Sequence, residues 1–176
     1  MRDSFLYNCK YRIGCKSADI VAMYPRPRGR DLIDDDITKN FGRIWPQHVA
    51  ALTQFLIDCR RHFDGDVDLF LVLCIIGDRT FSIRHAPKDL NFERWSTMET
   101  ADLRAEEINV QSLADYSGIP RETVRRKLNL LVEKGWVMRD DRGYITATQK
   151  AKTDLAPLTM SSLVYLTRMK ATLADM

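Results

Sequence analysis

The segment that decides the fold lies in the second half of the chain; from residue 108 to residue 151 it reads INVQSLADYSGIPRETVRRKLNLLVEKGWVMRDDRGYITATQKA. Asn109 is suited to cap a short helix, in which Leu113 and Ala114 would face inward. Gly118 then occupies the position where a tight turn between two helices requires a positive φ. The sequence therefore predicts a short helix that ends in a sharp turn.

A second helix is expected directly after this turn. Pro120 can begin it, because the proline ring presets φ to a helical value. Its buried face consists of apolar residues at spacings of four and three, namely Val124, Leu128 and Leu131. Lys134 and Gly135 end the helix, since a cation is favoured near its C-terminus and glycine adopts the left-handed conformation that follows the last turn.

Two short strands complete the unit. Trp136 to Arg139 and Tyr144 to Ala147 alternate as strands around Asp140-Asp141-Arg142-Gly143, which reads as a hairpin turn with glycine in a left-handed position. Helix, turn, helix and hairpin in this order predict a winged helix-turn-helix over residues 108–148, with a three-helix core and a β-hairpin wing. The expected fold class is mainly α, with additional N- and C-terminal helices.

The exposed face of the second helix carries the chemistry of this unit. Its first two turns are crowded with polar and charged side chains: Arg121, Glu122, Thr123, Arg125, Arg126 and Lys127. In the major groove of DNA, arginine can grip guanine through two hydrogen bonds, and glutamate can accept one from cytosine. With Arg142 in the wing, these residues are the predicted DNA-binding site.

The run Arg121-Glu122-Thr123-Val124-Arg125-Arg126 resembles the recognition helix of the Crp/Fnr family of bacterial transcription regulators. The resemblance is confined to the helix-turn-helix. It implies that Arg121, Glu122 and Arg126 read bases and that Thr123 contacts a phosphate.

The rest of the chain departs from the Crp/Fnr family. Residues 1–107 lack the train of short, glycine-punctuated strands that would form a cyclic-nucleotide-binding β-roll, so no such pocket is expected. Helices before the motif and an apolar helix after it are similar in architecture to the MarR family, which implies a dimer held together by N- and C-terminal helices. The wing is shorter than in that family, and residues 77–94 have no counterpart in it.

Further helices are predicted ahead of the motif. Apolar residues recur at spacings of three and four over residues 45–63, with Pro46 as the first helical residue. Asp66 can cap the next segment, residues 67–76, which reads as a buried helix with a buried strand as the alternative. A Ser-x-x-Glu capping box is expected to open another helix over residues 96–107.

Residues 1–36 are expected to form a basic arm or linker. Within them, residues 25–30 read Pro-Arg-Pro-Arg-Gly-Arg, which is too rich in proline, glycine and like charge for a helix or a central strand. Residues 27–30 also match the start of an AT-hook, which would place arginine in a narrow minor groove, although Asp31 replaces the final proline of that motif. A basic linker and an accessory minor-groove arm are the two alternatives.

Basic residues are concentrated in two blocks that flank an acidic one. Residues 1–30 contain 7 Lys and Arg against 2 Asp and Glu, residues 31–109 contain 9 against 15, and residues 110–152 contain 9 against 5. This distribution suggests two surfaces for a polyanion.

The C-terminal region, residues 149–176, is predicted to form an apolar helix for dimerisation. Its apolar stripe recurs at spacings of three and four, at Leu155, Leu158, Ser162, Leu166, Met169 and Leu173. Together with the N-terminal helical region, residues 37–107, this helix would hold a homodimer on double-stranded DNA. The sequence thus indicates a sequence-specific transcription regulator; the alternative is a winged-helix adaptor that docks on another protein.

Other classes of protein find little support in the sequence. The longest apolar run, residues 69–76, is far too short to cross a bilayer, and no signal-peptide pattern follows the basic start, so a soluble cytoplasmic protein is expected. The four cysteines show no metal-site or disulfide spacing, and Asp64-x-Asp66-x-Asp68 lacks the glycine and glutamate of a calcium loop. No catalytic motif, metal or cofactor is predicted, and a small-molecule effector is left open.

Overall fold

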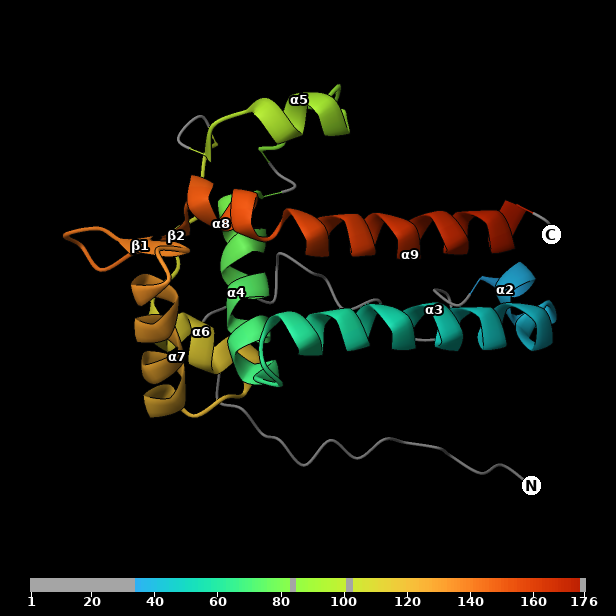
Figure 1. Ribbon diagram of the computed structural model, residues 1–176, viewed down its shortest axis with the longest axis horizontal. Helices are drawn as coiled ribbons and strands as arrows, with labels where there is room; N and C mark the ends of the chain where they lie inside the picture. Colours follow the sequence, from blue (N-terminus) through green and yellow to red (C-terminus); the bar gives the residue numbers. More distant parts are fainter. Residues whose placement is uncertain (1–33, 83–84, 101–102, 175–176) are drawn as a thin grey trace.

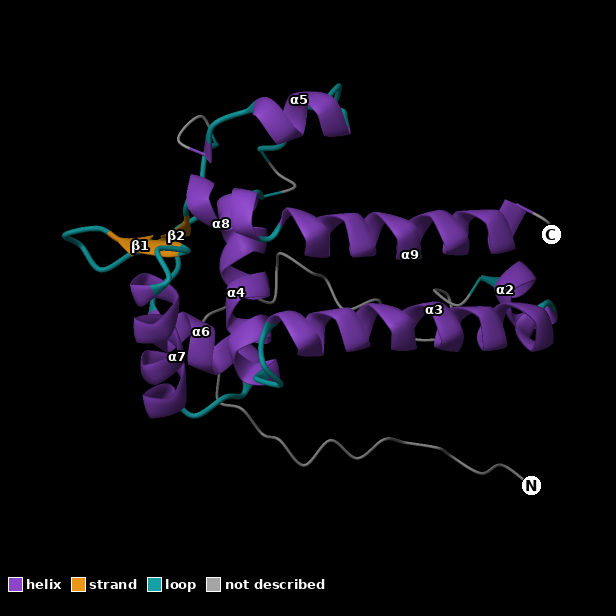
Figure 2. Cartoon of the chain, in the orientation of Figure 1, coloured by secondary structure: helices purple, strands orange, loops and turns teal. Residues whose placement is uncertain are grey.

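The structure is a computed structural model that describes residues 34–82, 85–100 and 103–174. These residues are mainly helical and include a small two-stranded antiparallel sheet (Figure 2). The elements, in chain order, are α2 (Asp35–Lys39), α3 (Phe41–His62), α4 (Val67–Thr80), α5 (Phe92–Thr97), α6 (Val110–Ser117), α7 (Arg121–Glu133), β1 (Val137–Arg139), β2 (Ile145–Ala147), α8 (Gln149–Asp154) and α9 (Ala156–Ala174). The AT-hook-like motif of residues 27–30 and most of the predicted basic arm lie outside the described residues.

Two long helices, α3 and α9, run antiparallel and project together from the rest of the molecule (Figure 1). From here on, the arm means this pair of helices and not the basic arm predicted over residues 1–36. Aromatic contacts join its two helices: the hydroxyl of Tyr165 lies 3.1 Å from Nδ1 of His48, and the rings of Phe55 and Tyr165 stack with centroids 6.2 Å apart. The arm is therefore held by contacts between the N- and C-terminal helices of a single chain.

The hydrophobic core lies at the other end of the molecule, in a body made of α4, α6, α7, β1 and β2 (Figure 1). Helix α4 packs against α6, α7 and β2. Its Val72 and Ile76 are fully buried, as are Leu131 of α7 and Ile145 of β2. The body is thus organised around α4, which the sequence predicts correctly as a buried helix capped by Asp66.

A buried polar network fixes the segment that leads into α6. The guanidinium of Arg79 lies 2.9 Å from Oε2 of Glu106, and the hydroxyl of Ser82 donates to Oε1 of the same carboxylate. The backbone N–H of Ile145 donates to the carbonyl of Ile108 at 2.9 Å, which ties the end of this segment to the sheet. The side chains of Arg79 and Glu106 are only 8% and 16% exposed. Residues 103–109 therefore run along the surface of the body without forming a helix.

This network explains why the helix predicted over residues 96–107 is wrong. Helix α5 ends at Thr97, where that helix was expected to begin. The side chain of Asn91 caps α5 by accepting from the N–H of Arg94, and the hydroxyl of Ser96 donates to the carbonyl of Glu93 instead of capping a new helix. Tertiary contacts of Glu106 override the local capping pattern.

The predicted start of the arm helix is also wrong. Helix α3 begins at Phe41, so Pro46 lies inside it. The carbonyl of Asn40 accepts from the N–H groups of Arg43 and Ile44, which begins the helix ahead of the proline. The missing N–H of Pro46 removes one hydrogen bond near the helix start, to a residue without a side chain, Gly42.

The C-terminal region forms two helices rather than one. Helix α8 ends at Asp154 and α9 begins at Ala156, with Leu155 between them. Pro157, the second residue of α9, favours this break, because it has no N–H to donate to the preceding turn. No helix in the described ranges is long and apolar enough to span a bilayer.

Candidate nucleic-acid interface

The turn between α6 and α7 is built from local hydrogen bonds. The side chain of Asn109 accepts from the N–H of Ser112 at 3.0 Å and caps α6, as predicted. The hydroxyl of Ser117 donates to the carbonyl of Leu113 and accepts from the N–H of Ile119. Gly118 has φ 72°, a conformation that favours glycine. This turn sets the direction in which α7 leaves α6.

Helix α7 buries one face against the body and presents the opposite one to solvent. Its three predicted core residues, Val124, Leu128 and Leu131, are buried. At its C-terminus, Gly135 has φ 70°, its N–H donates to the carbonyl of Val132, and the N–H of Trp136 donates to that of Leu131. This pair of bonds is the Schellman arrangement that the Lys-Gly sequence predicts.

Three arginines lie on the exposed part of α7: Arg121, Arg125 and Arg126. Arg121 forms no ion pair within the described part of the chain. Arg125 pairs with Glu122 at 2.8 Å, and Arg126 makes only a long contact of 3.5 Å with the hydroxyl of Thr123. An exposed pair of this kind contributes only about 0.3 to 0.5 kcal/mol. All three guanidinium groups can therefore be redirected to an external partner at little cost.

Lys127 has a different environment from the arginines. Its ammonium lies 2.6 Å from Oδ2 of Asp66, and the two side chains are 20% and 28% exposed. The other carboxylate oxygen of Asp66 accepts from the N–H of Leu69 and caps α4. Burial alone would raise the pKa of Asp66, but the hydrogen bonds from Lys127 and Leu69 and the lysine charge outweigh it and lower the pKa below the usual 3.8. The ion pair of Lys127 with Asp66 thus links α7 to the start of α4.

We expect Asp66→Asn and Lys127→Met each to lower the free energy of unfolding at pH 7 by about 1 to 2 kcal/mol, since either change leaves a half-buried polar group without its ionic partner. Asparagine still caps a helix, so Asp66→Asn isolates the ion pair. Chemical denaturation measures the loss, and Asp68→Asn, in the same turn of α4, is the control, with a loss of only a few tenths of a kcal/mol.

Asp66→Asn also tests the pH dependence of the ion pair between Asp66 and Lys127. Because the pKa of Asp66 is lower in the folded chain than in the unfolded chain, its stabilising effect is present above about pH 4 and is lost as the pH falls through the folded-state pKa. The stability gap between wild type and Asp66→Asn should therefore narrow below pH 4. A gap that stays constant down to pH 2 would show that the carboxylate charge is not what stabilises the contact.

The hairpin lies beside α7 and carries further basic groups. Strands β1 and β2 pair antiparallel, with Met138 opposite Thr146. Arg142 at the tip lies 3.4 Å from Glu107 and 3.5 Å from Asp140, and its guanidinium sits 5.0 Å from the centroid of the Tyr144 ring. Its side chain is still 71% exposed. Both ion pairs are long enough to exchange readily for another anion.

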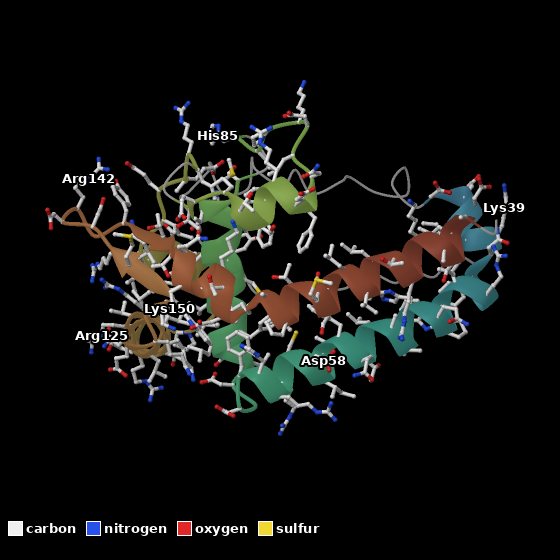
Figure 3. All side chains as sticks on the ribbon, turned by 45° about the horizontal axis from the view of Figure 1, so that its top comes forward. Lys39, Asp58, His85, Arg125, Arg142 and Lys150 are labelled. Atoms are coloured by element: carbon white, nitrogen blue, oxygen red, sulfur yellow. The ribbon has the colours of Figure 1, made fainter. Side chains whose placement is uncertain are left out.

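Glu107 also links the segment before α6 to Tyr144 of the hairpin. Its carboxylate accepts a hydrogen bond from the hydroxyl of Tyr144, and this bond, with the negative charge of Glu107, raises the pKa of Tyr144 above its usual 10.0. Arg142 and Arg125 both lie at the end of the molecule away from Lys39 at the tip of the arm (Figure 3). The structure therefore brings the predicted residues of α7 and of the hairpin to the same end.

Trp136 holds the hairpin, α8 and the arm in one arrangement. Its ring N–H donates to the carboxylate of Asp154 at 2.8 Å, and its ring packs against His62 and Phe63 at the end of α3. The hydrogen bonds from Lys150 and Trp136 lower the pKa of Asp154. The hairpin is thus positioned by contacts with α8 and α3 as well as by its own strands.

Two features of this region were not predicted from the sequence. Lys127 borders the buried face of α7, one residue before Leu128, and this spacing could have indicated a contact with the body. Arg139, exposed at the end of β1, extends the basic surface of the hairpin; its guanidinium lies against Gly143. Nothing in the local sequence pairs Lys127 with Asp66, because the two residues are 61 positions apart.

Within the described ranges, no group of three or more His, Cys, Asp and Glu residues is arranged to hold a metal ion. Comparison with known proteins found no matching family model, no similar curated protein and no similar solved structure.

Proposed function

We propose that residues 108–148, packed on α4, form a winged helix-turn-helix that binds double-stranded DNA sequence-specifically, with α7 in the major groove. One observation carries the proposal: the exposed half of α7 that follows the tight turn at Gly118 presents Arg121, Arg125 and Arg126, none of which is held by a buried partner. Recognition helices contact base edges with these N-terminal turns.

The side chains have distinct roles in this proposal. Arg121, Glu122 and Arg126 read bases, and breaking the exposed Glu122–Arg125 pair frees both partners for DNA. Thr123 contacts a phosphate, as does Arg142 from the hairpin tip, because hydroxyl and guanidinium groups commonly bind the backbone there. Lys127, engaged by Asp66, positions α7 and contributes to binding indirectly.

We further propose that the protein acts as a homodimer through the arm. An apolar stripe on α3 is exposed beside the contact with α9; it consists of Phe41, Trp45, Val49 and Leu56, which are 42–53% exposed. A continuous row of exposed apolar side chains is typical of interaction surfaces. To read two half-sites, a two-fold pair of arms must hold its two copies of α7 about 34 to 36 Å apart, the spacing of successive major grooves on one side of DNA.

A second candidate function, a protein-binding adaptor, is favoured by a different observation. The C-terminal half of α7 and the neighbouring strand expose large apolar side chains, namely Leu130, Val132 and Met138, which are 41%, 47% and 57% exposed. Such residues suit a protein partner better than a phosphate backbone.

The two candidates separate in one binding experiment. Fluorescence anisotropy with a labelled random duplex is measured at 50 mM and 200 mM salt; a DNA-binding protein with several phosphate contacts should lose affinity by roughly 10-fold or more between the two. An adaptor should show no saturable binding at either concentration, and that result would overturn the proposal.

A further inference from the structure

An apolar cavity of about 320 Å³ lies where the arm meets the body. Its walls come mainly from α3, α4, α5, α8 and α9, and Figure 1 shows α5 above α8 and the base of the arm. Aromatic rings contribute much of the lining: Phe55, Phe63, Phe70, Phe81 and Trp95. The volume falls at the lower end of the range of about 300 to 1,000 Å³ that is typical of small-molecule sites.

The α4 wall is left open by a glycine. Gly77 lies in the third turn of α4, and a Cβ built on it would meet no atom within 4 Å. Glycine inside a helix destabilises it by roughly 0.5 to 1 kcal/mol relative to alanine. The chain therefore keeps an unfilled space at a position where the methyl group of an alanine would fit and would stabilise the helix.

Two threonine hydroxyl groups of the lining already have two partners each within the protein. Thr80 donates to the carbonyl of Ile76 and accepts from the N–H of Ala147. Thr148 donates to the carbonyl of Gly135 and accepts from the N–H of Ala151. A ligand would therefore gain little hydrogen bonding from these two hydroxyl groups.

Lys152 is the one charged residue of the lining. Its ammonium donates to the carbonyl of Met98 and lies 4.8 Å from the centroid of the Trp95 ring. Within the described part of the chain no carboxylate lies within ion-pair distance of it. Desolvation lowers its pKa and outweighs the negative charge of Glu99, which acts in the opposite direction. A half-buried ammonium held by a carbonyl and a ring still has the capacity to bind an anion.

From this combination we infer that the cavity binds a small apolar molecule with a single carboxylate, whose apolar part lies among the aromatic rings and whose carboxylate pairs with Lys152. A chain of roughly eight carbons suits the space. No residue of α7 lines this cavity, and ligand binding there does not require DNA binding.

Isothermal titration calorimetry of the full chain tests it without DNA, using octanoate and its neutral counterpart octan-1-ol as probes. Octanoate should bind at one site per chain, about tenfold more tightly than octan-1-ol, because only the carboxylate can pair with Lys152. Lys152→Met should weaken octanoate about tenfold and leave octan-1-ol within about twofold. Absence of octanoate binding to the wild type, or no effect of Lys152→Met, would overturn the inference.

A second variant tests the location of the site. Gly77→Phe fills the cavity and should abolish the binding of both probes, whereas Gly77→Ala leaves most of the space and serves as the control. Thermal unfolding of both variants without ligand checks that the fold is kept. Equal octanoate affinity in wild type and folded Gly77→Phe would place the binding elsewhere.

Discussion

Val49→Glu combined with Leu166→Glu should convert a dimeric protein into a monomer. Both side chains are exposed, at 42% and 55%, and helical spacing places them on the same side of the arm, next to the α3–α9 contact. In a symmetric dimer the double variant would bury four unpaired carboxylates, which should weaken association by at least about 100-fold. Light scattering coupled to size-exclusion chromatography measures the molar mass.

The arm offers a matched control on its other side. Met160 and Val164 of α9 are both 49% exposed and line a shallow cavity with Gln54 and Asp58 of α3, away from the proposed interface. Met160→Glu combined with Val164→Glu should therefore leave the dimer intact. A monomeric wild type would contradict dimerisation itself, and dissociation by the control pair alone would move the interface to the opposite side.

Arg126→Ala should cost about 1 to 3 kcal/mol of binding to the preferred DNA sequence, or roughly 5- to 150-fold in affinity, and should relax the preference at one base pair. The reason is that its guanidinium, tied only by a 3.5 Å contact to Thr123, is available for two hydrogen bonds to a guanine. Anisotropy titrations with the preferred duplex and with single-base variants of it measure both effects.

Two further variants serve as comparisons for Arg126→Ala. Lys39→Ala removes the same charge at the tip of the arm, far from α7, and should leave binding unchanged within about twofold (Figure 3). Arg142→Ala should weaken preferred and random duplexes alike and lower the slope of log affinity against log salt by about one. If Arg126→Ala behaves in the same way as Arg142→Ala, Arg126 contacts a phosphate rather than a base.

The α6–α7–hairpin region follows closely from the sequence because short-range chemistry determines it. Asn109 and its Ser112 partner are three residues apart, and the glycines at 118 and 135 adopt positive φ where the pattern requires it. The strands Val137–Arg139 and Ile145–Ala147 lie within the predicted ones. Each of these features is fixed by residues that are neighbours in the chain.

Other parts of the chain could not be predicted, because distant residues determine them. Glu106 is drawn into an ion pair with Arg79, 27 positions away, and this contact prevails over the capping pattern at Ser96. The apolar stripe predicted on the C-terminal helix is also divided: Leu155 and Leu158 pack on the core, whereas Leu166 is exposed. A helical pattern of apolar residues identifies an apolar face but not the surface that covers it.

In the candidate site, too, some features follow from the local sequence and others depend on distant residues. The exposed positions of Arg121, Arg125 and Arg126 follow from the helical period of the buried residues. The sequence groups Lys127 with them, yet its ammonium is held by Asp66. A long side chain at the edge of a buried face can reach the body or the solvent, and only the position of α4 decides between them.

The most direct test of DNA recognition by α7 is selection of bound sequences from a pool of random duplexes by the wild-type protein, with sequencing of the enriched fraction. A dimer that reads DNA through two copies of α7 should enrich a two-fold symmetric sequence whose half-sites are centred about 10 base pairs apart. The same selection with Arg126→Ala should lose information at one position of each half-site. A folded wild-type protein that enriches no sequence over the starting pool would contradict sequence-specific recognition by α7.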